Sequence, residues 1–258
     1  MSGIDIVKSN YVKEIIKRGE RLDKRGAFDI REIRIENNPL VNAEGSARVN
    51  LGLTDVIAGV KAVIEEPHSD TPKEGNLIVS AELLPAASAD FETGPPGPAA
   101  IELARVVDRG IRAGRCIDME GLFLEEGKSI SLYVDIYVLD YDGNLFDACS
   151  IAAMRALMNT KLPKYENGEF NMEDRSVPLK IESIVSSTTY GKFGDVIVAD
   201  MNAEEEAATD ARLTITTDGK AVKAMQKGLN GSFTIDEVER LVGISLKKHE
   251  ELKSKMES

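Results

Sequence analysis

Apolar and polar positions follow two periods along this chain, and these periods predict strands and helices. From Ala47 to Leu51 they alternate, and a β-rich run follows Gly52, which predicts a β-hairpin. The other strand-like runs lie at 77–85 and 129–140, and the helix-like runs lie at 5–19, 99–114 and about 144–160. Strands and helices are therefore interspersed in the first two thirds of the chain.

The last third shows strands followed by a helix once more. Strand-like runs lie at 179–188, 196–201 and 211–217. Thr234 then opens a helix to about Lys253 with the Thr-x-x-Glu pattern of a capping box. The polar stretch at about 161–178 is typical of a linker. We therefore predict an α+β protein of two related units, residues 1–178 and 179–258.

The composition predicts a soluble protein with a sizeable core. Hydrophobic residues make up 42% of 258 positions, and the formal net charge is −12. Because that charge repels nucleic acid and anionic membranes, any contact with RNA requires a local basic patch. With two cysteines, two histidines and no pair of Cys-x-x-Cys motifs, we expect neither a zinc site nor a cofactor. The absence of a signal-peptide core and of long apolar runs predicts a cytoplasmic protein.

At 133–157 a strand-like run passes through an Asp-Gly turn directly into a helix. A helix N-terminus presents free N–H groups and the positive end of the helix dipole, which favours an anion. A phosphate site usually adds a hydroxyl or a cation, whereas this turn supplies Asn144, Leu145, Phe146 and Asp147. The backbone shape suits a phosphate, but the two apolar side chains favour a packing role.

Three arginines share one face of the predicted helix at 99–114. Arg105, Arg109 and Arg112 stand at i, i+4 and i+7, within one narrow arc. We call them the arginine stripe. Acids at 102 and 108 are near enough to pair with them. The sequence leaves two roles open, a set of surface ion pairs and a strip that binds phosphates.

Acids gather after the strand-like run at 196–201. They are Asp200, Glu204, Glu205, Glu206 and Asp210, and the three glutamates fall in a predicted loop between two strands. Paired carboxylates can hold a divalent ion or act as general acid and base. A solvated acidic loop is the commoner origin of such a run. The sequence does not decide between these roles.

Six segments together carry a resemblance to a known family. They are "RLDKRGAFDIREI", "AEGSARVNLGLTDVIAGV", "ELARVVDRGIR", "DGNLFDACSIAAMRAL", "EEEAATDARLTITTDG" and "AMQKG". Their order and spacing resemble the RNase PH family, and most closely the non-catalytic RNase PH-like ring subunits of the archaeal exosome. The resemblance spans nearly the whole chain. It implies an α+β RNase PH fold, with a ribosomal S5 domain 2-like unit followed by a smaller C-terminal RNase PH domain.

The resemblance also implies an assembly and a reaction. Catalytic and non-catalytic subunits alternate in a hexamer, a trimer of heterodimers that carries RNA-binding cap proteins. The ring degrades RNA from its 3′ end with inorganic phosphate. Active members bind the phosphate with a Ser/Thr–Arg pair, and Leu145 and Phe146 stand at those positions here. Two acids of active members align with Asp200 and Glu206.

These departures predict a subunit with no catalytic residues or metal ligands of its own. It would support the active site of its catalytic partner, and Arg105, Arg109 and Arg112 would contact single-stranded RNA. Two other functions stay open. One is an active phosphate-dependent exoribonuclease with Asp200 as its acid. The other is a structural scaffold without RNA contact.

Overall fold

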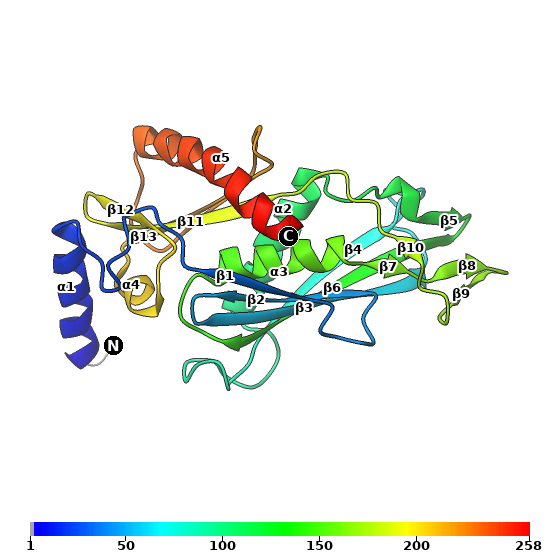
Figure 1. Ribbon diagram of the computed structural model, residues 1–258, viewed down its shortest axis with the longest axis horizontal. Coiled ribbons are helices and arrows are strands. Elements are labelled where there is room, and N and C mark those ends of the chain that lie inside the picture. Colours follow the sequence, from blue (N-terminus) through cyan, green and yellow to red (C-terminus); the bar gives the residue numbers. More distant parts are fainter. Residues whose placement is uncertain (1–2) are drawn as a thin grey trace.

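The computed structural model describes residues 3–258 and contains two larger β-sheets with helices between them (Figure 1). The first has the order β1-β2-β3-β6-β4, with β5 paired to β6. Its strands are β1 (Ile33–Asn37), β2 (Gly45–Leu51), β3 (Thr54–Glu65), β4 (Asn76–Leu83), β5 (Phe123–Glu125) and β6 (Lys128–Asp140). The predicted hairpin of β2 and β3 is confirmed, and Gly52 takes the positive φ of +60° that its turn requires.

Two helices cover one face of this first sheet. Helix α2 (Pro98–Gly114) packs on β4, and α3 (Leu145–Met158) packs on β2 and β3. A 3₁₀ turn, η1 (Glu120–Leu122), precedes β5. Most side chains of α3 are buried because the helix also contacts the second sheet on its far side. Its apolar residues therefore surround the helix instead of forming a single stripe.

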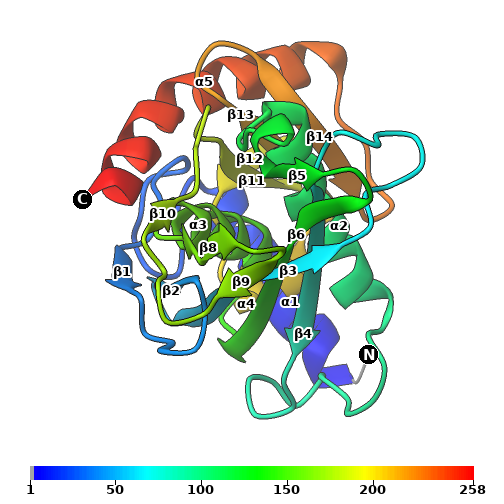
Figure 2. The same cartoon turned by 90° about the vertical axis from the view of Figure 1, so that its right-hand side faces the viewer.

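The second sheet has the order β12-β11-β13-β14. Its strands are β11 (Ser186–Phe193), β12 (Val196–Ala199), β13 (Ala211–Thr217) and β14 (Val222–Gly228). One face meets α3 through hydroxyls, as where Ser187 Oγ donates to Ser150 Oγ at 3.1 Å. The other face packs its apolar residues, among them Tyr190 and Ile215, against α5 (Ile235–Glu257). Figure 2 shows α5 lying over this outer face.

The two terminal helices both pack against the second sheet and its neighbouring elements. Helix α1 (Gly3–Lys17) comes first in the chain but packs on the short α4 (Ala203–Ala208) beside the second sheet, burying Val12 and Ile16 there. The end of α5 reaches back to the main core with Leu252 and Met256. The division at residue 178 stays a proposal. No helix within residues 3–258 has both the length and the apolar character needed to cross a membrane.

Several predictions from the sequence need correction. Glu204–Glu206 do not lie in a loop but form half of the six-residue α4, which Asn202 begins with a capping box. Strand β11 does not occupy 179–188; it starts at Ser186 and ends at Phe193. Strand β14 was not predicted. The expected linker contains four short strands: β7 (Lys161–Leu162), β8 (Lys164–Glu166), β9 (Glu169–Asn171) and β10 (Val177–Pro178).

Candidate functional site

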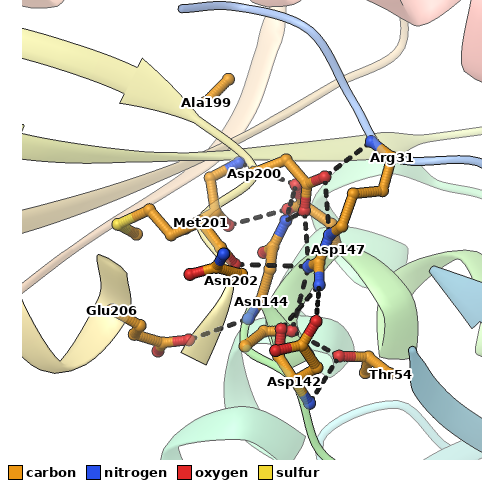
Figure 3. A network of polar contacts seen from close by, with 12 residues as sticks. Arg31, Thr54, Asp142, Asn144, Asp147, Ala199, Asp200, Met201, Asn202 and Glu206 are labelled. Carbon is orange, nitrogen blue, oxygen red and sulfur yellow. Dashed lines mark hydrogen bonds and ion pairs between the residues drawn. The ribbon is translucent and has the colours of Figure 1, made fainter. Parts of the chain in front are cut away.

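The strand-turn-helix junction meets the second sheet at a buried carboxylate, Asp200 (Figure 3). Asp200 follows β12 with a left-handed φ of 49°, and its side chain is fully buried. Its Oδ1 accepts hydrogen bonds from Arg31 Nη2 at 2.8 Å and from Asn144 Nδ2 at 2.7 Å. Its Oδ2 accepts from the Arg31 backbone N–H at 2.7 Å and from Arg25 Nη1 at 2.8 Å. Both oxygens therefore already have partners within the chain.

Three arginines from the first 31 residues hold the segment around Asp200, and we call Arg21, Arg25 and Arg31 the arginine clamp. Arg21 pairs with the buried Glu205 at 2.5 Å and donates to the carbonyl of Asp200 at 2.8 Å. Arg31 also donates to the carbonyl of Asp142 at 2.6 Å, so it joins the turn before α3 to the second sheet. The clamp therefore fixes the positions of both elements.

The charge state of Asp200 follows from these contacts. Burial acts to raise the pKa of its carboxyl, but the hydrogen bonds and positive charge of Arg31 outweigh burial and hold the pKa below its ordinary value. Asp200 is therefore ionised at neutral pH. A carboxylate whose oxygens are saturated by donors is a poor general acid or base, because it cannot reach a substrate.

The N-terminus of α3 is likewise occupied by the chain itself. Asn144, the residue before the helix, donates its backbone N–H to Glu206 Oε2 at 2.8 Å. Its side chain bridges Asp147 and Asp200, at 2.9 and 2.7 Å. The carboxylate of Glu206 thus accepts the backbone N–H of the residue that caps α3, at the end of the helix where a phosphate would bind.

Leu145 and Phe146 pack as the sequence predicts. Leu145 is half-buried against the main core, and Phe146 is 6% exposed. The guanidinium of Arg212 lies 4.2 Å from the centre of the Phe146 ring. Arg212 also pairs with Glu206 at 3.5 Å and with Glu102 at 3.2 Å. This cation therefore neutralises internal acids and covers an apolar ring.

Asp147 in the first turn of α3 completes the network. It is buried and accepts hydrogen bonds from the backbone N–H and the hydroxyl of Thr189, at 3.0 and 2.7 Å. Burial raises the pKa of Asp147 to about 7 despite the hydrogen bonds that Asn144 and Thr189 donate. The residue joins α3 to β11 and is closed off from solvent.

The acidic cluster predicted after β12 is thus divided among internal partners. Asp200 and Glu205 pair with the arginine clamp, Glu206 accepts the Asn144 N–H before α3, and Asp210 pairs with Lys13 at 2.6 Å. Glu204 points to solvent. Among residues 3–258, no group of three or more His, Cys, Asp or Glu side chains is placed to hold a metal ion. Four of the five acids therefore have partners within the chain.

Sequence reasoning missed the arginine clamp. Its partners around Asp200 are about 170 to 180 positions away, so no local pattern in the sequence indicates them. The one available signal was the clustering of three arginines within 11 positions of a chain that has an excess of acids.

The arginine stripe lies on the exposed side of α2. Arg112 pairs with Asp108 at 2.9 Å, as the ion-pair alternative predicted, and also donates to the carbonyl of Leu77. Arg109 donates to Gln226 of β14 at 3.2 Å. Arg105 is exposed. The role of the three arginines in RNA binding stays a prediction.

Comparison with known proteins places this geometry in a family. Models of the two domains of the 3′ exoribonuclease family, RNase PH, match residues 29–163 and 183–248. The "Exosome complex component Rrp42" of Pyrococcus horikoshii is 43% identical over 253 residues, covering 96% of this chain and 92% of that protein. The protein of the same name from Thermoplasma volcanium is 44% identical, covering 96% and 95%.

Solved structures give the same result. The chain in the "archaeoglobus fulgidus exosome with RNA bound to the active site" superposes with a TM-score of 0.92 at 41% identity, covering 98% of this chain and 99% of that one. A chain of an "Archaeal exosome core" gives 0.88 at 38% identity, covering 99% and 98%. The predicted α+β RNase PH fold is confirmed, and the chain belongs to the RNase PH family of 3′ exoribonucleases.

Proposed function

We propose that this chain is a non-catalytic ring subunit of an archaeal exosome, a complex that degrades RNA from its 3′ end with inorganic phosphate. It alternates with a catalytic RNase PH-like subunit in a hexamer and supports the active site of that partner. The names and structures of its relatives support the assembly, because they are exosome components along nearly their full length.

One observation carries the lack of catalysis. The two acids that align with those of active members, Asp200 and Glu206, are already bound by Arg31, Asn144 and Arg212. The positions of the phosphate-binding pair hold Leu145 and Phe146. A phosphate at this junction would meet an apolar ring and two carboxylates, and their charges would repel it.

The arginine stripe supports the role in RNA binding. Its three guanidinium groups lie on the exposed side of one helix in a chain of net charge −12, so they form a local basic strip. Arginines in such a row bind successive phosphates through charge-assisted hydrogen bonds. The RNA would then lie along α2 on its way to the partner's active site. We place the complex in the cytoplasm, with RNA-binding cap proteins as further partners.

The decisive experiment compares the chain with its partner. A single-stranded RNA is incubated with phosphate and this chain, with the catalytic RNase PH-like subunit of the same organism, or with both at equal concentration. We expect efficient release of nucleoside diphosphates from the mixture only, and none when phosphate is omitted. Release by this chain alone would disprove the proposal and favour an independent exoribonuclease.

A further inference from the structure

The three arginines of the stripe differ in what they already contact. Arg112 donates its Nε to both oxygens of Asp108 at 2.9 Å, and its Nη2 binds the carbonyl of Leu77. Leu77 belongs to β4, an edge strand of the first sheet. Arg112 therefore donates a hydrogen bond to a backbone carbonyl of the edge strand. The carboxylate of Asp108, within hydrogen-bonding distance, compensates the charge of Arg112.

Arg109 has a different partner, a neutral one. Its Nη1 donates to Gln226 Oε1 at 3.2 Å, and Gln226 Nε2 donates to Glu102 Oε1 at 2.9 Å. The other oxygen of Glu102 accepts from Arg212 at 3.2 Å. The amide of Gln226 thus stands between Arg109 and Glu102, which lies two turns earlier on the same helix.

The orientation of that amide is fixed by chemistry. A guanidinium can only donate and a carboxylate can only accept, so the oxygen of Gln226 must face Arg109 and its nitrogen must face Glu102. A glutamate at position 226 would repel Glu102 and neutralise Arg109. A lysine there would repel Arg109. The amide holds Arg109 in place without cancelling its charge.

Arg105, one turn before Arg109, is exposed, and its guanidinium makes no ion pair within the described part of the chain. The stripe therefore contains two arginines with uncompensated charge at i and i+4. The third, Arg112, is committed to a fold contact.

We infer that Arg105 and Arg109 carry the phosphate contacts of the stripe, that Gln226 is the positioning residue for Arg109, and that Arg112 serves mainly the fold. This inference rests on the proposed function, because it assigns roles within the RNA strip of the assembled ring. It also gives β14, from the second sheet, a part in RNA binding through a side chain that holds an arginine of α2.

The test uses the ring assembled with the catalytic subunit and measures the affinity for single-stranded RNA over a series of salt concentrations. R105A and R109A should each weaken binding about tenfold, since a hydrogen bond between charged groups is lost. Each should also lower the slope of log K against log salt by about 0.7, the value for one phosphate of a single strand. R112A should leave that slope unchanged and lower the melting temperature.

Two substitutions at position 226 test whether Gln226 positions Arg109 or only packs against it. Q226E should weaken RNA binding as much as R109A, because the new carboxylate pairs with Arg109. Q226A should raise KM about threefold at constant kcat, the behaviour of lost uniform binding. R34A is the matched control and should change nothing. It removes an exposed arginine that pairs with Glu32 on the first sheet.

The outcomes distinguish this inference from the proposed function. If the R105A/R109A double variant loses RNA binding and Q226E binds RNA as the wild type does, only the assignment of Gln226 is overturned. A fall in the salt slope of R112A equal to that of R109A would overturn the assignment of Arg112. Unchanged RNA binding by the double variant would overturn the RNA-binding role in the proposed function itself.

Discussion

Asp200 and its partners decide, at the scale of single residues, what this junction can do. In the interior an isolated carboxylate would be neutralised by proton uptake, but here two arginines and one asparagine keep it ionised. The same contacts that stabilise its charge also deny its oxygens to a substrate. The residue is therefore bound into the fold at the position that the family resemblance aligns with an acid of active members.

The substitution D200N tests this role. It keeps the shape but removes the charge that Arg31 and Arg25 need, so we expect a loss of about 3–5 kcal/mol in the free energy of unfolding at pH 7. Because the folded pKa lies below the ordinary 3.8, the carboxylate stabilises the protein above that pH, and its contribution disappears as the pH falls through the folded pKa. The difference between wild type and D200N should therefore shrink below about pH 4.

Chemical denaturation at pH 7 and pH 3 measures both parts of this prediction. D142N is the control, because the side chain of Asp142 is 31% exposed and its ion pair with Arg31 is longer, at 3.2 Å. It should cost at most about 1 kcal/mol. A D200N protein as stable as D142N at pH 7 would mean that the buried pair contributes little.

At the scale of elements, the sequence predicts the helices and strands in which burial of one face sets the spacing of apolar residues. The hairpin of β2 and β3 and helix α2 both follow that rule. Strand β11 does not, because its face toward α3 is built from Ser187 and Thr189, whose hydroxyls bond Ser150 and Asp147. Helix α4 was missed because its three glutamates favoured a solvated loop, although Asn202 and Glu205 form a capping box within the local sequence. The partners of Glu205 and Glu206, Arg21 and Asn144, are remote in sequence and cannot be inferred from local patterns.

A second prediction concerns Leu145 and Phe146 at the start of α3. Changing Leu145 to Ser and Phe146 to Arg restores the residue types that the family resemblance assigns to the phosphate site. We expect no phosphorolysis by this double variant alone, since Glu206 still accepts the Asn144 N–H and Asp200 remains clamped. The new arginine would also lie against Arg212, which now covers the Phe146 ring.

The measurement is phosphate-dependent release of nucleoside diphosphates by the folded variant, with the catalytic subunit as the positive control. Circular dichroism establishes that the variant is folded. Activity of the variant alone would mean that the two side chains were the only missing parts and that the acids at 200 and 206 can be freed.

At the scale of the whole molecule, charge and packing point to dependence on a partner. The chain carries a net charge of −12, and its basic strip offers only Arg105 and Arg109 with uncompensated charge. Two phosphate contacts on a single strand correspond to a salt slope of about 1.4. So small a contribution, opposed by the overall negative charge, cannot hold RNA tightly at physiological salt.

We therefore expect the isolated chain to bind single-stranded RNA weakly, with a slope of log K against log salt no steeper than about 1.4. The assembled ring should bind more tightly and with a steeper slope, because the catalytic subunits add their own phosphate contacts to each strip. Fluorescence anisotropy with a labelled RNA at several salt concentrations measures both. Tight binding by the isolated chain with a slope near 5 would reveal a basic surface beyond the stripe, and the chain would then bind RNA independently of its partner.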